Sequence, residues 1–128
     1  MTQAHNMTDY EKTCAEFRPA VPEYFNFAGD IVDKWARDPG KLAILWVDDA
    51  GNEVRKTFLD LVNASKKLAN VLTASGVRRD DVILVVLPRN TEWWETLTAG
   101  IRMGALVAPG PTQLTNKDLA FRANTSQA

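Results

Sequence analysis

The clearest pattern of apolar and polar positions lies between residues 81 and 110. Six apolar residues run without a polar break over 82–87, which is typical of a strand covered on both faces, as in a parallel sheet. Pro88 ends this strand because proline has no N–H for the ladder. Apolar residues then recur at helical spacing up to Gly104, and 105–108 is a second short apolar run. The pattern predicts one strand–helix–strand unit with a right-handed crossover.

Side chains that can cap a helix precede three of the predicted helices. The pattern Thr-x-x-Asp occurs before two of them and is a capping box with Asp in place of Glu. The capping candidates are Thr57 with Asp60, Asn90 or Thr91, and Thr115 with Asp118. Gly76 is expected to end the first of these helices.

The segment before Thr57 predicts one more helix and a hairpin. From Phe27 the apolar spacing becomes helical, with Asn26 as the cap, and Pro39-Gly40 closes the helix. The runs 42–47 and 53–57 are predicted to pair across a turn. The whole pattern predicts an α/β fold: part of a parallel or mixed sheet with flanking helices, an N-terminal helix and a hairpin.

Composition excludes several classes of partner and site. The net charge of −1, from 15 basic and 16 acidic residues, does not fit a nucleic-acid partner. No apolar run approaches the roughly 20 residues that span a bilayer. A single cysteine, Cys14, excludes an internal disulfide and a cysteine-cluster metal site. His5, the only histidine, lies in a polar terminus and is predicted to face solvent.

Residues 1–17 carry three acidic side chains and one lysine. Mitochondrial transit peptides avoid acids, and secretory signals need an apolar core that this segment does not have. We therefore expect a cytoplasmic location.

The residues offer few candidates for chemistry. Neither a GxxxxGK phosphate loop nor a GxGxxG turn is present, so there is no nucleotide fingerprint. The loop at 110–113 follows the strand at 105–108, at the edge where open α/β sheets place ligands. Gln113 in this loop is either a turn residue or a ligand contact. Lys66-Lys67 form a solvated helix face or an anion patch, and Trp93-Trp94 belong to the core or to an aromatic pocket.

Several blocks of residues, taken in order and spacing, resemble one known family. They are Tyr24-Phe25-Asn26-Phe27-Ala28; Thr57-Phe58 with Leu61; Lys67 with Ala69-Asn70-Val71-Leu72; Leu87-Pro88-Arg89 with Glu92-Trp93-Trp94; and Pro109-Gly110-Pro111-Thr112-Gln113-Leu114-Thr115 with Asp118. The chain is similar to the N-terminal part of a medium-chain acyl-CoA synthetase, within the AMP-dependent synthetase/ligase (adenylate-forming) superfamily. The resemblance covers about Pro22 to Thr125. Pro111 departs from it, because the family usually has threonine there.

The resemblance implies a two-step ligase reaction of fatty acid metabolism. A medium-chain fatty or aromatic carboxylic acid attacks the α-phosphate of ATP with the help of Mg²⁺, giving an acyl-adenylate. Coenzyme A then displaces AMP. In the family, the glutamine of this loop lies beside the coenzyme A channel, so the resemblance assigns Gln113 as a coenzyme A contact. It assigns no catalytic residue and no metal ligand to this chain.

Members of this family are several times longer, and their phosphate loop, adenine site and catalytic lysine lie beyond residue 128. We therefore interpret residues 1–21 as a polar lead-in and residues 22–128 as an incomplete N-terminal domain. The chain alone is expected to bind none of these cofactors and to be inactive. We expect it to expose an apolar sheet edge and the underside of its last helix, and therefore to be marginally stable or to self-associate. Two hypotheses stay open. The sequence is the beginning of a ligase, cut short by a gene-model break, a frameshift or an artificial boundary, or it is a non-catalytic remnant that acts as a protein-interaction module.

Overall fold

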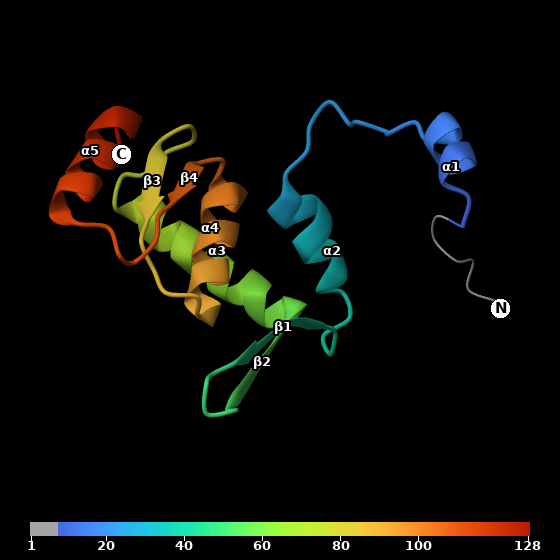
Figure 1. Ribbon diagram of the computed structural model, residues 1–128, viewed down its shortest axis with the longest axis horizontal. Coiled ribbons are helices and arrows are strands. Elements are labelled where there is room, and N and C mark those ends of the chain that lie inside the picture. Colours follow the sequence, from blue (N-terminus) through green and yellow to red (C-terminus); the bar gives the residue numbers. More distant parts are fainter. Residues whose placement is uncertain (1–7) are drawn as a thin grey trace.

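The computed structural model describes residues 8–128. This part of the protein consists of helices and two small sheets (Figure 1). His5 lies outside the described residues. The elements, in chain order, are α1 (Tyr10–Glu16), the π-helical turn η1 (Ala28–Val32), α2 (Asp33–Trp35), β1 (Leu42–Val47), β2 (Glu53–Thr57), α3 (Phe58–Ala74), β3 (Val82–Val85), α4 (Thr91–Met103), β4 (Leu106–Pro109) and α5 (Asn116–Ser126). The α/β class predicted from the apolar pattern is confirmed.

Helix α1 interrupts the lead-in, which the sequence pattern indicated to be without periodicity. The Asp9 carboxylate accepts a hydrogen bond from the Lys12 N–H at 3.0 Å and so caps the first turn. The helix has no buried residue, and it stands away from the other helices in Figure 1. A local cap, not packing, therefore accounts for this helix.

The helix predicted from Phe27 is present, but its first part is a π-helical turn that continues directly into α2. The Asn26 side chain accepts from the Gly29 N–H at 3.1 Å, and the Asp30 carboxylate accepts from the Asn26 N–H at 2.7 Å. These reciprocal bonds confirm Asn26 as the capping residue. Ala28 and Val32 are buried.

Strands β1 and β2 form the predicted antiparallel hairpin, which is a separate two-stranded sheet. Leu45 lies opposite Arg55, and the register is interrupted once, between Leu42 and Ile44. The Asp48 carboxylate shapes the turn because it accepts hydrogen bonds from the N–H groups of Ala50 and Asn52.

Strand β3, helix α4 and strand β4 form the predicted strand–helix–strand unit, with β3 and β4 parallel. Strand β3 stops at Val85, two residues before the predicted end, where it pairs with Pro109 of β4. The Asn90 side chain accepts from the Trp93 N–H and caps α4, and Gly104 ends the helix with a φ of 77°. Both predicted boundaries of α4 are confirmed.

The core lies between η1, α2, α3 and α4. The capping box that starts α3 is present in both directions between Thr57 and Asp60, as predicted. Val32, Leu61 and Val62 form the buried cluster, with Ala36, Ile44 and Phe58 packed against it. Gly100 of α4 touches the Val107 side chain of β4 so closely that an added Cβ would collide with it. This contact brings α4 onto one face of the β3–β4 sheet.

Helix α5 lies by the opposite face of that sheet and has no buried residue. A groove of about 520 Å³, here called the α5 groove, is lined by Leu84, Ala108, Leu114, Asp118, Phe121, Arg122, Thr125 and Ser126. Phe121 is 68% exposed and Leu106 is 58% exposed. Within residues 8–128, β3 and β4 pair only with each other. The predicted exposure of apolar surface at the sheet and the last helix is confirmed, whereas the prediction that β3 is covered on both faces is wrong, because only Val85 of β3 is buried.

Candidate functional site

A hollow of about 550 Å³ opens where β3 and β4 end. It is lined by Leu87, Pro88 and Arg89 after β3, by Trp93 from the first turn of α4, and by Pro109, Gly110, Pro111, Thr112 and Gln113 at and after the end of β4. We call it the carboxyl-end hollow. Open α/β sheets bind ligands at this edge because the loops that follow neighbouring parallel strands meet there. The structure thus places Gln113 in a hollow, as the position of its loop predicted.

One wall of the hollow is the loop after β4. The Gly110 N–H donates to the Val85 carbonyl at 2.8 Å and ties this loop to the end of β3. A Cβ on Gly110 would lie 2.8 Å from Leu114 Cδ1 and 3.5 Å from Val86 Cγ2, so a larger residue here must move the Leu114 side chain. Gln113 itself is exposed at the rim. The loop backbone is therefore held in place while the Gln113 amide stays accessible.

The other wall is the segment between β3 and α4. The Asn90 N–H donates to the Pro88 carbonyl at 2.8 Å, which makes a tight turn. The indole Nε1 of Trp46, on β1, donates to the Arg89 carbonyl at 2.7 Å across 43 positions of sequence. The hairpin thus reaches the rim of the hollow. No sequence signal announced the Trp46 contact.

Arg89 is the one charged residue among those that line the hollow. Its guanidinium makes no hydrogen bond or ion pair with any other residue in the part of the chain that the structure describes. Trp93 beside it is half-buried and meets Trp94 edge-on, with ring centroids 4.7 Å apart. Trp94 is 51% exposed, so the first of the two alternatives for this pair, the core, does not hold for Trp94. The hollow offers a cation, an aromatic ring and an amide.

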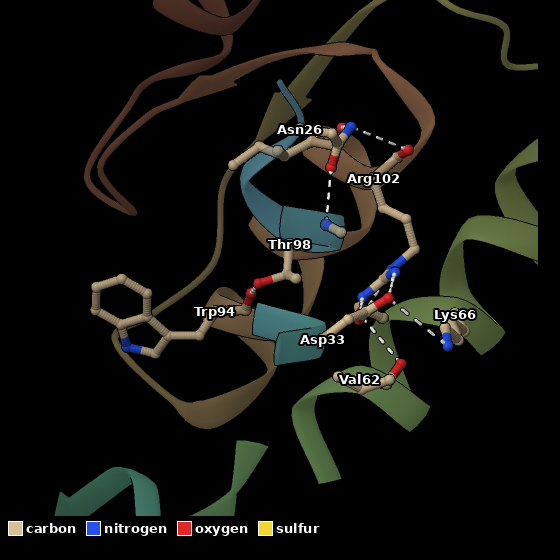
Figure 2. A network of polar contacts seen from close by, with 10 residues as sticks. Asn26, Asp33, Val62, Lys66, Trp94, Thr98 and Arg102 are labelled. Atoms are coloured by element: carbon tan, nitrogen blue, oxygen red, sulfur yellow. Dashed lines mark hydrogen bonds and ion pairs between the residues drawn. The ribbon is translucent and has the colours of Figure 1, made fainter. Parts of the chain in front are cut away.

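A second cluster of polar side chains joins three helices (Figure 2). Arg102 of α4 donates to both Asp33 oxygens, at 2.7 and 3.0 Å, and to Ser65 Oγ at 3.3 Å. The side chain of Arg102 is 14% exposed and that of Asp33 is 32% exposed. The hydrogen bonds from Arg102 lower the pKa of the Asp33 carboxyl, the charges of Arg102 and Lys66 add to this, and burial acts against it.

The contacts in this cluster hold parts of the fold together. The Asn26 amide donates to the Ile101 carbonyl at 2.8 Å, and the buried Ser65 hydroxyl donates to the Val62 carbonyl. Lys66 Nζ lies 3.9 Å from the Asp33 carboxylate, so Lys66 belongs to an ion pair and not to a free anion patch. The cluster fastens η1 and α2 to α3 and α4, and the carboxyl-end hollow is the stronger candidate site.

The described residues contain no helix long and apolar enough to cross a membrane. Among residues 8–128 there is also no group of three histidine, cysteine or acidic side chains that could hold a metal ion.

The model of one protein family, described as "AMP-binding enzyme", matches residues 31–128. This chain belongs to that family. The resemblance found in the residue blocks is confirmed at family level, because the match covers both walls of the carboxyl-end hollow and the whole strand–helix–strand unit.

Similar proteins include mitochondrial acyl-coenzyme A synthetases of mammals. The rat protein ACSM3 is 42% identical over 130 residues, and the match covers 96% of this chain and 22% of the relative. Human ACSM5 is 44% identical over 118 residues, covering 87% of this chain and 20% of the relative. The chain thus spans about a fifth of the length of the curated relatives it matches.

The names of these relatives correct the expected location. ACSM3, ACSM4 and ACSM5 are each described as mitochondrial, and the expectation of a cytoplasmic protein is wrong. That expectation rested on the composition of residues 1–17, which are acidic and without an apolar core. The charge of a short segment carries less information than similarity over 96% of the chain.

Solved structures agree with the family assignment. An acyl-CoA synthetase of Brucella canis superposes with a TM-score of 0.78 at 26% identity, covering 94% of this chain and 22% of that one. The N-terminal subdomain of Klebsiella oxytoca NpsA superposes with a TM-score of 0.67 at 20% identity, covering 77% of this chain and 25% of that one. The second likeness shows the fold alone.

Proposed function

We propose that this chain is the N-terminal portion of an ATP-dependent acyl-CoA synthetase. The enzyme would activate a medium-chain fatty or aromatic carboxylic acid as acyl-AMP and transfer it to coenzyme A. The observation that carries this proposal is the carboxyl-end hollow, which lies at the ligand-binding edge of the sheet in a chain of the AMP-binding enzyme family. The division into a lead-in over 1–21 and an incomplete domain over 22–128 belongs to the same proposal.

Coenzyme A is the ligand that fits the residues of the hollow. The Gln113 amide can both donate and accept hydrogen bonds, and the backbone of coenzyme A's pantetheine arm contains amides that need both. We assign Gln113 the role of contacting coenzyme A. The hydrogen bond between Gly110 and Val85 holds the loop and so keeps the Gln113 amide at the rim of the hollow.

ATP and Mg²⁺ do not fit residues 8–128. No cluster of acidic side chains there could hold the metal, and the hollow contains one cation for a triphosphate. We therefore propose that residues 1–128 alone do not catalyse the reaction. In the enzyme, ATP and Mg²⁺ would be bound by segments outside these residues.

The runner-up proposal is a non-catalytic module that binds a full-length synthetase. The exposed apolar side chains at α5 and β4 favour it, since such surface is usually covered by another protein segment. Both proposals give the chain the same fold. They differ in where the rest of the active site lies: in the same polypeptide under the first proposal, and in a separate full-length synthetase under the second.

A hybrid enzyme tests the first proposal. Residues 22–128 replace the matching segment of the rat relative ACSM3, and acyl-CoA formation from medium-chain and aromatic acids is measured. We expect activity in the hybrid and no ATP–pyrophosphate exchange by the isolated 128-residue chain. A hybrid that folds and exchanges pyrophosphate but forms no acyl-CoA would contradict the coenzyme A role of this segment. Exchange by the isolated chain would contradict its predicted inactivity.

Within the hybrid, Gln113→Ala is expected to raise the KM for coenzyme A while leaving ATP–pyrophosphate exchange unchanged. The exchange reaction precedes coenzyme A binding, so it reports the integrity of the rest of the site. Asn70→Ala is the matched control, because Asn70 is an exposed amide on α3. If Gln113→Ala and Asn70→Ala change the KM for coenzyme A equally, Gln113 is not a specific coenzyme A contact.

A further inference from the structure

We propose that Arg89 binds a phosphate group of coenzyme A in the carboxyl-end hollow and that Trp46 positions Arg89 for this role. The assignment of the ligand rests on the proposed function, and the role of the two residues is additional to it. Arg89 supplies the only charge on the lining of the hollow, so an anionic group of any ligand there must meet it first.

The Arg89 side chain is exposed and has no partner among residues 8–128 that would compete with a ligand. A guanidinium presents a planar fork of N–H donors that matches the oxygens of a phosphate, and it stays protonated at any physiological pH. By contrast, the guanidinium of Arg102 is fully engaged with Asp33 and Ser65. Of these two arginines, only Arg89 is available.

Trp46 holds the backbone of Arg89 and not its side chain. The 2.7 Å bond from Trp46 Nε1 to the Arg89 carbonyl attaches the segment after β3 to the hairpin. The backbone of Trp46 is itself held in the β1–β2 ladder, where Trp46 pairs with Val54. The Cα of Arg89 is thereby fixed at the rim while its guanidinium can reach the ligand, which makes Trp46 a positioning residue.

The other residues that line the hollow favour a ligand that carries further groups besides a phosphate. Trp93 presents an aromatic ring and Gln113 an amide in the same hollow. Coenzyme A has a nucleotide end that carries phosphates and a pantetheine arm that carries amides. ATP also carries phosphates, so the two sources must be separated by experiment.

Nuclear magnetic resonance of the ¹⁵N-labelled 128-residue chain tests the proposal. Coenzyme A, pantetheine and ATP without metal are titrated separately while the Arg89 Nε–H and Gln113 side-chain signals are followed. The sequence led us to expect no cofactor binding by the chain alone, but Arg89 and Gln113 both line the hollow. We therefore now expect coenzyme A to shift both signals, pantetheine to shift Gln113 alone, and ATP to bind more weakly than coenzyme A. Arg89→Gln should weaken coenzyme A binding about fivefold at low salt and leave pantetheine binding unchanged.

Arg79→Gln is the matched control. Arg79 is an exposed arginine that precedes β3, at the opposite end of the strand from Arg89. Equal weakening by both variants would show general charge attraction and overturn the assignment. Binding of ATP as tight as that of coenzyme A would also overturn it, as would an Arg89 signal that does not shift.

Trp46→Phe tests the positioning role. We expect about twofold weaker coenzyme A binding with unchanged pantetheine binding, because a loss of structure alone would weaken both. Parallel weakening of both ligands would reject that role. The hybrid synthetase provides a second measurement: Arg89→Gln, but not Arg79→Gln, should raise its KM for coenzyme A about fivefold. If the hybrid forms acyl-CoA and Arg89→Gln leaves this KM unchanged, the Arg89 proposal fails and the proposed function stands.

Discussion

The two faces of the β3–β4 sheet differ in how they are covered. On one face, α4 packs against β4 through Gly100 and against α3, and Arg102 ties both helices to α2. On the other face, α5 has no buried residue and leaves Phe121 exposed beside the α5 groove. Figure 1 shows α3 and α4 side by side, with α5 at the edge of the molecule.

The difference does not come from how the helices begin. Helices α3 and α5 start with the same capping box, complete in both directions. A cap stabilises a helix end, but burial of an apolar face supplies most of the stability of a helix in a protein. Leu61, Val62 and Ala69 of α3 are buried, and no residue of α5 is. The two faces therefore differ in how well their helices pack, and not in how the helices are capped.

Arg102→Met is expected to give the largest effect. It removes both hydrogen bonds to Asp33 and leaves a carboxylate whose side chain is 32% exposed without its main partner. We expect a loss of about 2 kcal/mol, below the range for a fully buried pair because Asp33 keeps contact with water. Urea unfolding followed by circular dichroism measures it. The control, Arg55→Met, breaks an exposed pair with Glu53 and should leave the midpoint unchanged.

The pH dependence of the same variant checks the cause. The folded pKa of Asp33 is lowered, so its contribution is present above the unfolded pKa of about 4 and is lost as pH falls through the folded pKa. The stability difference between wild type and Arg102→Met should therefore be full at neutral pH and shrink under acid conditions. A difference that is constant down to pH 2 would indicate lost packing and not a lost ion pair.

Gly100→Ala should be the next largest change. The new Cβ would collide with the Val107 side chain on β4. Overpacking costs about 1–3 kcal/mol and better helix propensity returns about 1, so we expect a net loss of about 1.5 kcal/mol. The double variant with Val107→Ala should recover part of the loss in the same urea titration. Additive losses would show that the two residues do not meet.

The two capping boxes allow a direct comparison of the faces. Thr57→Ala should lower the free energy of global unfolding by about 1 kcal/mol, because α3 is part of the core. Thr115→Ala should fray α5 without moving the global midpoint. Hydrogen exchange distinguishes them: only the amides of α5 should exchange faster in Thr115→Ala. Equal shifts of the midpoint would show that α5 unfolds together with the core.

Phe121→Ser should have the smallest effect on stability, within about 0.5 kcal/mol, because its side chain is already exposed. We propose that the apolar surface around the α5 groove makes the chain self-associate. Sedimentation velocity should then show less association in Phe121→Ser than in wild type. Asn124→Ser serves as the control, because Asn124 is exposed on α5 and does not line the α5 groove. Association that is unchanged in Phe121→Ser would place the contact elsewhere.

Much of the fold follows from local rules that a sequence exposes. Thr57, Asn90 and Thr115 cap the helices they precede, and Gly104 ends α4 in the left-handed region. These features depend on residues within four positions of one another, so their spacing is sufficient to predict them. The hairpin and the place of Gln113 after a parallel strand were also predicted, from apolar runs and the turns that separate them.

Other features depend on residues that are distant in sequence. Sequence reasoning left Arg102 without a role, although its partner Asp33 lies 69 positions away. It treated the turn after β3 and the strand with Trp46 as separate, yet one hydrogen bond joins them. It also left open whether Trp93-Trp94 belong to the core or to an aromatic pocket, and Trp94 is 51% exposed in the structure.

The sequence by itself determined where α3, α4 and α5 begin, which family the chain resembles and which loop faces the ligand edge of the sheet. Only the tertiary structure decided that Arg102 is engaged while Arg89 has no partner among residues 8–128, and that α3 has buried residues while α5 has none. The physical reason is how far apart in the sequence the interacting residues lie. Caps, turns and backbone conformations are satisfied among neighbouring residues, whereas burial and ion pairing depend on which distant surfaces meet when the chain folds.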